Sequence, residues 1–382
     1  MTKFKSIILL GPGTEMFPMI SKQYPKFSLP LINTTLLAHN INWLRPVSSE
    51  IIIIGLKKHT RLINEIIKEC YAAIPIEFIP ISQFEGSVSP LLGIRHRIDS
   101  SNVIVTKGDI ISEIPASDIV RAFREKDCVC MSIFGETNSS NCITGHDNDK
   151  IYFYTSNSEE SFDIPASFLR EHQQMDLTRK LDTMQFYIFE GRLLDLVNIE
   201  IFSFKSNLFP FFVSHLRKIN PVRMYRPQEG RILQIKNCDD YFSGCQLLKL
   251  TQDFELWTEN ATSQHTEYKN IIKPGVKKRA SFEDVNGKSR NIVGSEFTIN
   301  DAFIINTIVG NHCFIENGTA IIDSIIMNNV KIGANCKIEK CIIGNGVFIG
   351  DNSVLIDCRV SHEYKIDKDV VAKSKSFSAI DF

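Results

Sequence analysis

The sequence predicts a two-part fold, in which a Rossmann-like α/β domain with a mainly parallel sheet precedes a left-handed parallel β-helix. In residues 1–230, short apolar runs alternate with amphipathic stretches, as strands and helices do in a parallel sheet with helices on both faces. From residue 291 on, an aliphatic residue recurs every six positions, followed by Gly or another turn-compatible residue. We therefore expect the α/β domain over 1–230, a helix and polar linker over 231–290, and the β-helix over 291–382.

The elements of the first domain follow from its apolar pattern. Strands are expected over residues 5–10 and 50–55, the second with four consecutive isoleucines that suit a strand buried on both faces. Further strands are expected over 74–81, 101–106 and 128–134, and helices over 36–44, 61–72, 116–125 and, after a helix-rich stretch from 193, 241–250. Ligands of such sheets bind beyond the carboxyl ends of strands, where Gly11 and the Gly108-Asp109 pair fall.

The β-helix prediction rests on the six-residue spacing. Three hexads stand in register over residues 343–360, with Ile343, Ile349 and Leu355 at equivalent positions. Three hexads form one triangular coil, and stacked coils bury their aliphatic residues in one column. A five-residue step from Ile338 to Ile343 breaks the period. An amphipathic helix is excluded, because a period of six does not stay on one face of a helix with 3.6 residues per turn.

Composition restricts the functional classes. The 382 residues suggest two or three domains, and 43% apolar with 23% charged residues excludes wholesale disorder. A net charge of −1 provides no global field for nucleic acid or anionic lipid, and no apolar run approaches the roughly 18 residues of a membrane span. The ten cysteines form no Cys-x-x-Cys pair, so we expect reduced thiols in a cytosolic protein, without bound metal.

The order of these motifs resembles a known family. A Gly-rich loop after the first strand, Tyr24-Pro25-Lys26, Gly108-Asp109 and then a hexapeptide β-helix resemble the nucleotidyltransferase-like family, which includes the sugar-1-phosphate nucleotidyltransferases. Within it, four segments are similar to the gamma subunits of eukaryotic translation initiation factor 2B. They are residues 107–113, residues 168–172 leading into 181–189, residues 324–330, and Asp357-Cys358-Arg359-Val360.

The resemblance implies a nucleotide site that has lost its chemistry. Five residues match the family's phosphate and magnesium positions and are expected to be vestigial nucleotide-binding residues: Gly11, Gly13, Thr14, Lys26 and Asp109. Two others depart from the pattern. Pro12 removes an amide donor from the loop, and Glu15 stands where the family has an arginine. A carboxylate about 4 Å from a phosphate costs roughly 4 kcal/mol at an effective dielectric near 20.

The sugar side departs further from the family pattern. Gln185 occupies the position of a family glycine that lies against the sugar, and the loop around Gly86 lacks the family's second glycine. We therefore expect no catalytic residue, no metal and no cofactor in this chain. An active sugar-1-phosphate nucleotidyltransferase, similar to mannose-1-phosphate guanylyltransferase, stays open as an alternative, as does a regulatory relative that senses a nucleotide sugar.

The resemblance also implies partners. A gamma subunit supports the complex that exchanges GDP for GTP on initiation factor 2, and its direct partner is the epsilon subunit, which carries the exchange catalysis in a C-terminal helical domain. Since this sequence ends at Phe382, soon after the hexads, we expect no such domain here. The expected partners are the epsilon subunit, the other exchange-factor subunits and initiation factor 2, with no direct contact to nucleic acid or membrane.

Overall fold

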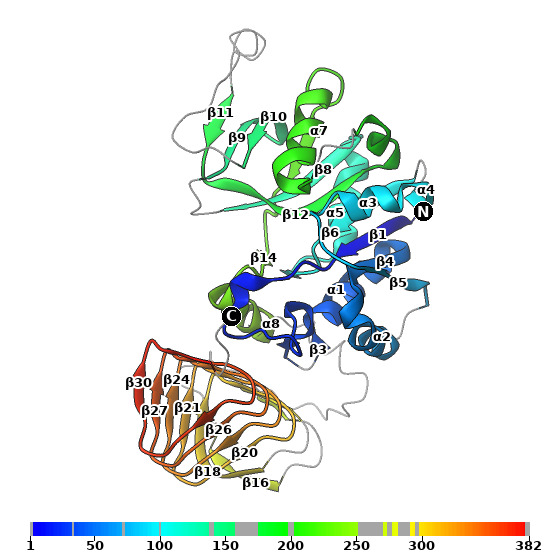
Figure 1. Ribbon diagram of the computed structural model, residues 1–382. Coiled ribbons are helices and arrows are strands. Elements are labelled where there is room, and N and C mark those ends of the chain that lie inside the picture. Colours follow the sequence, from blue (N-terminus) through cyan, green and yellow to red (C-terminus); the bar gives the residue numbers. More distant parts are fainter. Residues whose placement is uncertain are drawn as a thin grey trace. The chain divides into compact units, whose positions relative to one another are not determined.

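The computed structural model describes residues 3–32, 34–70, 73–98, 101–136, 141–156, 175–197, 202–250, 270–272, 277–281, 291–294 and 298–378. The chain divides into two compact units, Met1–Gly11 with Leu37–Gln234, and Pro12–Leu36 with Ile235–Phe382 (Figure 1). Residues 12–36 thus fold with the C-terminal part, although they follow the first strand directly in sequence. Each unit is described by itself.

The first unit is built on one ten-stranded sheet. Its order is β11-β9-β10-β13-β8-β12-β6-β1-β4-β5. The strands are β1 (Phe4–Leu9), β4 (Ser48–Leu56), β5 (Ile76–Ile81), β6 (Asn102–Thr106), β8 (Cys130–Glu136), β9 (Ile143–Asp147), β10 (Lys150–Thr155), β11 (Asp176–Thr178), β12 (Leu181–Glu190) and β13 (Val222–Tyr225). The predicted strands β6, β1, β4 and β5 pair in parallel, as does β13 with β8, whereas β12 runs antiparallel between β6 and β8.

Helices cover both faces of this sheet, as predicted. Ile7 of β1 belongs to a buried cluster with Leu91 of α3 and Phe212 of α7. Phe4 points to the opposite face, because side chains alternate along a strand, and there its ring meets that of Phe123 on α5. The α-helices among the described residues are α1 (Leu36–Leu44), α2 (Thr60–Glu69), α3 (Ser89–Gly93), α4 (Arg95–Ile98), α5 (Ala116–Glu125), α7 (Phe209–Leu216) and, in the second unit, α8 (Cys238–Leu250).

The stretch from residue 193 is less helical than predicted. Two strands, β13 and β14 (Ile232–Gln234), lie between α7 and α8, and β14 pairs antiparallel with β7 (Ile110–Ser112). Val222 and Met224 are buried while the residues between and after them are partly exposed, which is the period-two pattern of a strand. Such a short alternating pattern is hard to recognise in the sequence when helical segments lie on both sides of it. Among the described residues, no helix is long and apolar enough to cross a membrane.

The second unit contains the predicted hexapeptide β-helix. Its strands, all in parallel pairs, are β15 (Asn270–Ile272), β16 (Lys277–Ser281), β17 (Asn291–Val293), β18 (Thr298–Ile305), β19 (Ile308–Val309), β20 (Phe314–Ile315), β21 (Ala320–Ile322), β22 (Ile325–Ile326), β23 (Lys331–Ile332), β24 (Lys337–Glu339), β25 (Ile342–Ile343), β26 (Phe348–Ile349), β27 (Val354–Ile356), β28 (Arg359–Val360), β29 (Lys365–Ile366), β30 (Val371–Lys373) and β31 (Ser376–Phe377). A short antiparallel pair, β2 (Pro30–Leu31) and β3 (Thr34–Thr35), completes the unit. The first two β-helix strands, β15 and β16, arise from residues that the sequence assigns to a polar linker.

The interior column is confirmed, with a coil one residue shorter than predicted. Ile343, Ile349 and Leu355 are completely buried in one apolar core. From Phe303 on, each paired residue stacks on one 17 positions away, as Ile332 does on Ile349, rather than on one three hexads away. The earlier pairs lie 16, 21 or 22 positions apart. The five-residue step that seemed to break the period therefore recurs at one corner of each 17-residue coil.

Each corner of a coil requires a left-handed residue. Positive φ angles recur in three columns, at Asn306, Asp323, Lys340, Asp357 and Ser374, at His312, Asn329, Gly346 and Glu363, and at Asp301, Gly318, Asn335, Asn352 and Asp369. Asn, Asp and Gly supply most of them, because these residues enter the left-handed region at the lowest cost. The corners are therefore encoded by residue type, just as the interior is encoded by spacing.

Candidate functional site

The predicted phosphate-binding residues are divided between the two units. Gly13 has a φ of 66° and precedes a single 3₁₀ turn, Thr14–Met16. A Cβ atom on Gly13 would lie 2.6 Å from the Cβ of Lys26, so these two predicted site residues pack directly together in the second unit. Gly11 belongs to the first unit, and a Cβ added there meets nothing within 4 Å. The side chain of Glu15 lies outside the described residues.

Residues 12–36 are fastened to one corner of the β-helix. The Nε2 atom of His362 hydrogen-bonds the carbonyl oxygen of Met19 at 2.8 Å, and its Nδ1 accepts from the Asn345 N–H at 2.9 Å. The ring of Tyr24 stacks on that of His362 with centroids 4.0 Å apart, and its hydroxyl donates to Glu363. These partners require the neutral imidazole with its proton on Nε2, and burial lowers the pKa of His362 accordingly.

This contact ends a polar ladder that runs up the corner. The amide oxygen of Asn328 accepts from the backbone N–H of Asn311, and that of Asn345 accepts from Asn328. His362 takes the next position, where an imidazole reaches farther than an asparagine. The segment that contains Gly13 and Lys26 is thereby tied to the β-helix. Hexad spacing identifies inward residues only, so sequence reasoning missed the role of His362.

Helix α8 is docked on the same unit. Arg359 donates from a guanidinium nitrogen to Asp239 in the first turn of α8, at 2.9 Å. The thiol of Cys238 lies 3.4 Å from the carbonyl oxygen of Met16. Ile325 and Ile342 stand in the strand column of Arg359, pair in register with each other and are buried. The part of this face around Ile325 and Ile342 is therefore shielded from solvent.

Asp109, the predicted magnesium ligand, is engaged by an amide. It is 5% exposed, and its Oδ1 accepts from Nε2 of Gln234 at 3.3 Å. The contact is built by β14, because Gln234 pairs with Ile110, the residue after Asp109. Asn40 of α1 supports the same turn by accepting from the Ile110 N–H. Sequence reasoning found Asp109 but missed Gln234, which is distant in sequence and has no charge.

These residues do not fit a magnesium ion. Magnesium is held by carboxylate oxygens, substrate phosphates and water in octahedral geometry. At Asp109 an N–H donor points at one carboxylate oxygen. Among the described residues, no three His, Cys, Asp or Glu side chains gather closely enough to hold a metal. The turn after β6 is therefore held by hydrogen bonds that involve Gln234 and Asn40.

On the predicted sugar side, Gln185 keeps the backbone of a glycine. Its φ is 55°, at a bulge where the pairing of β12 with β8 shifts between Thr183 and Tyr187. The bulge is held by hydroxyls, since Ser132 bonds Thr183 at 2.6 Å and the Phe186 carbonyl at 2.9 Å. A glutamine there accepts a conformation that glycine adopts without strain. Position 185 thus keeps a backbone conformation that suits glycine, while the glutamine side chain occupies space that a glycine would leave open.

The loop around Gly86 is packed against the chain itself. A Cβ on Gly86 would lie 2.3 Å from the carbonyl oxygen of Phe202. That oxygen also accepts from Val88 N–H at 3.1 Å, and the hydroxyl of Ser87 accepts from Phe204 N–H at 2.7 Å. This loop therefore uses its backbone groups internally. The related segment at 168–172 lies outside the described residues.

A buried acid near the bulge is satisfied internally as well. Asp182 is 4% exposed and accepts from the Tyr154 hydroxyl at 2.7 Å and from Lys205 at 2.5 Å. Burial, and then Asp182, raise the pKa of Tyr154 far above its usual range. A buried carboxylate requires such partners, because a buried charge without them is costly. Nothing in the sequence pattern distinguished this acid.

Comparison with known families agrees with the two units. A family model described as nucleotidyl transferase matches residues 5–142, and one described as GlmU-like, C-terminal hexapeptide, matches residues 277–375. A search of curated proteins finds no match. A nucleotidyl transferase domain followed by a hexapeptide domain indicates the sugar-1-phosphate nucleotidyltransferase superfamily, which confirms the superfamily predicted from the sequence.

Proposed function

We propose that this chain is a non-catalytic member of its superfamily that acts as a subunit of a larger assembly. The observation that carries the proposal is the Gln234 amide on Asp109, at 3.3 Å. Nucleotidyl transfer requires a cation that offsets the charge developing on the departing pyrophosphate, and a carboxylate holds that cation. The only predicted magnesium ligand is turned inward and bonded to a neutral side chain.

Two further observations support a lost activity. Pro12 has no N–H to offer a phosphate, in a loop whose family role is to surround phosphates with amides. Gln185 holds a side chain at a left-handed position of the predicted sugar site. Each change alone is a moderate loss. Together they remove a phosphate donor, the metal ligand set and room for the sugar.

The assembly we propose is the exchange factor for initiation factor 2. The similarity of residues 107–113, 324–330 and 357–360 to the gamma subunits supports this choice. In such a role the chain is the scaffold and partner of the epsilon subunit, which exchanges GDP for GTP. It contacts the other exchange-factor subunits and initiation factor 2 through protein surfaces in the cytosol.

The open coil of the β-helix suits assembly. Within the described part of the chain, β29, β30 and β31 each pair with a strand on one side only. Unpaired strand edges associate readily with other chains, and proteins cover them with partners or further segments. Val371 on β30 is 78% exposed, so an apolar side chain stands on this last coil. We propose that the epsilon subunit covers this end.

A regulatory nucleotide-sugar sensor is the second candidate. It is favoured by the close packing of Gly13 against Lys26, which preserves a tight turn and a cation of the phosphate loop. Such a protein would associate with an active guanylyltransferase instead of an exchange factor. Co-purification of the native chain followed by mass spectrometry of its partners distinguishes the two.

The loss of catalysis has its own test. The purified chain is incubated with GTP or another nucleoside triphosphate, a hexose 1-phosphate and Mg²⁺, and pyrophosphate release is compared with a blank. We expect no release above the blank. Turnover that depends on the hexose 1-phosphate and disappears in an Asp109→Asn variant would contradict the proposal.

A Gln234→Asp variant tests whether the hydrogen bond from Gln234 to Asp109 keeps a cation out. A second carboxylate beside Asp109 creates like-charge repulsion, so without Mg²⁺ the variant should melt below the parent. Mg²⁺ should then raise its melting temperature, because two carboxylates form a cation site. The parent should not respond to Mg²⁺. A parent stabilised by Mg²⁺ as strongly as the variant would show that Gln234 does not block the site.

A further inference from the structure

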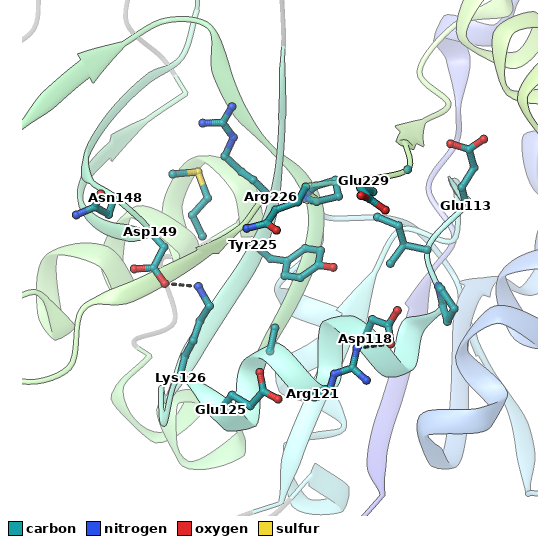
Figure 2. A pocket seen from close by; sticks show the side chains of 17 residues that line it. Glu113, Asp118, Arg121, Glu125, Lys126, Asn148, Asp149, Tyr225, Arg226 and Glu229 are labelled. Carbon is teal, nitrogen blue, oxygen red and sulfur yellow. Dashed lines mark hydrogen bonds and ion pairs between the residues drawn. The ribbon is translucent and has the colours of Figure 1, made fainter.

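A surface pocket opens on the first unit, and none of the residues discussed as the candidate site lines it. Its volume is about 990 Å³, and five segments contribute to it: the end of β7, α5, the turn between β9 and β10, β13, and residues 226–230. Figure 2 shows these segments around one shared opening. A pocket of this size accommodates several side chains of a bound segment.

One wall of the pocket is a single face of α5. Asp118, Arg121, Ala122 and Glu125 line it, and their spacing of three and four residues places them on one side of the helix. The facing wall is the loop 226–230, which follows β13 directly. The described residues give no hydrogen bond to the backbone of this loop until Arg231. Its C=O groups, and its N–H groups other than the missing one of Pro227, are therefore available to an extended chain.

The aromatic ring of Tyr225 lies between these walls. It is partly buried, and burial followed by the Asp118 carboxylate raises its pKa, so it stays a neutral phenol. In Figure 2 its ring points between Glu229 and Asp118. An aromatic face flanked by carboxylates is a favourable environment for a guanidinium or ammonium group.

The charges that line the pocket are unbalanced toward acid. Five acidic and three basic side chains contribute. Asp118 pairs with Arg121 at 2.9 Å, and Lys126 pairs with Asp149. Glu125 and Glu229 are exposed and make no ion pair with any described residue. Among the basic residues that line the pocket, only Arg226 makes no ion pair with a described residue. The unpaired charge therefore favours a cationic ligand.

We propose that this pocket binds an extended segment of a partner protein that carries an arginine or lysine. The basic side chain lies over Tyr225 beside Glu229, and the segment's backbone hydrogen-bonds the loop 226–230. Addition of an extended peptide to free backbone groups is a common recognition mode, and Tyr with charged neighbours is a frequent centre of binding energy. The inference does not depend on the proposed exchange-factor role, because it uses this pocket alone.

Selection from a phage library of random linear peptides on the immobilised full chain tests the proposal. The enriched peptides should share a Lys or Arg. A fluorescein-labelled selected peptide, followed by polarisation, should bind the parent chain, and replacing its basic residue by Gln should weaken binding about tenfold or more.

Variants of the chain locate the binding. Glu229→Lys and Tyr225→Leu should each weaken binding of the labelled peptide about tenfold or more, with unchanged thermal melting for the first. Glu69→Lys, the same charge change at an exposed position of α2, should bind like the parent. No enrichment, enrichment of peptides without a basic residue, or equal binding by Glu229→Lys would each overturn the proposal.

Discussion

Replacing Ile349 by Asp tests the β-helix register at its most buried point. Ile349 is completely buried and stacks in register between Ile332 and Ile366. Loss of its packing costs about 2–5 kcal/mol, and an unpaired buried carboxylate adds several more. A folded domain has a stability of only about 5–15 kcal/mol, so the variant should lose its β-helix.

The matched control is the same substitution one residue earlier. Phe348 lies on the same strand with its side chain outward and 42% exposed, so Phe348→Asp should cost about 1 kcal/mol. Thermal melting of the full chain, followed by circular dichroism, measures both. We expect a shift of at least about 10 °C or loss of a transition for Ile349→Asp, and at most about 4 °C for Phe348→Asp. Equal shifts would refute the inward and outward assignment of this strand.

Three further changes probe the candidate site and the core. Gly13→Ala should lower the free energy of unfolding by about 1–3 kcal/mol, because a Cβ would strain the positive φ and meet Lys26. Gly11→Ala should change the free energy of unfolding by less than about 0.5 kcal/mol, and urea unfolding measures both variants. Gln185→Gly should be more stable than Gln185→Ala by about 1 kcal/mol in the same assay, since both lack the side chain and only Ala is strained at 55°; equal values would argue against a strained bulge. Burial lowers the pKa of His39 to about 4 from 6.5, so between these pH values the unfolded chain binds a proton that the folded chain does not. The free energy of unfolding should therefore fall by up to about 3 kcal/mol as pH drops through this window. An equally steep fall in a His39→Gln variant would exclude His39 as the cause.

Much of the fold follows from local pattern. The four isoleucines of β4 are buried on both faces, and the hexads identify the interior column through Ile349. The 17-residue coil was not predicted, because a single five-residue step cannot be distinguished from an irregularity until it recurs at the same corner. The antiparallel β12 was also unpredictable, since buried strands look alike in either direction.

The candidate site was predictable only in part. Gly13, Lys26 and Asp109 are found by motif; Gly13 packs against Lys26, and Asp109 is buried. The residues that decide their present role come from distant segments. Gln234 contacts Asp109, and His362 holds the segment of Gly13 and Lys26 through Met19; both are tertiary contacts, which no local pattern encodes. The sequence therefore identifies residues of the candidate site, and the structure shows which groups contact them.

Release of labelled GDP from initiation factor 2 tests the central claim most directly. The epsilon subunit is assayed alone, with this chain, and with a chain truncated before β26. We predict that the full chain forms a stable complex with the epsilon subunit and accelerates GDP release, while the truncated chain does neither. A full chain that leaves release unchanged and does not co-elute with the epsilon subunit, yet releases pyrophosphate from GTP and a hexose 1-phosphate, would contradict the account.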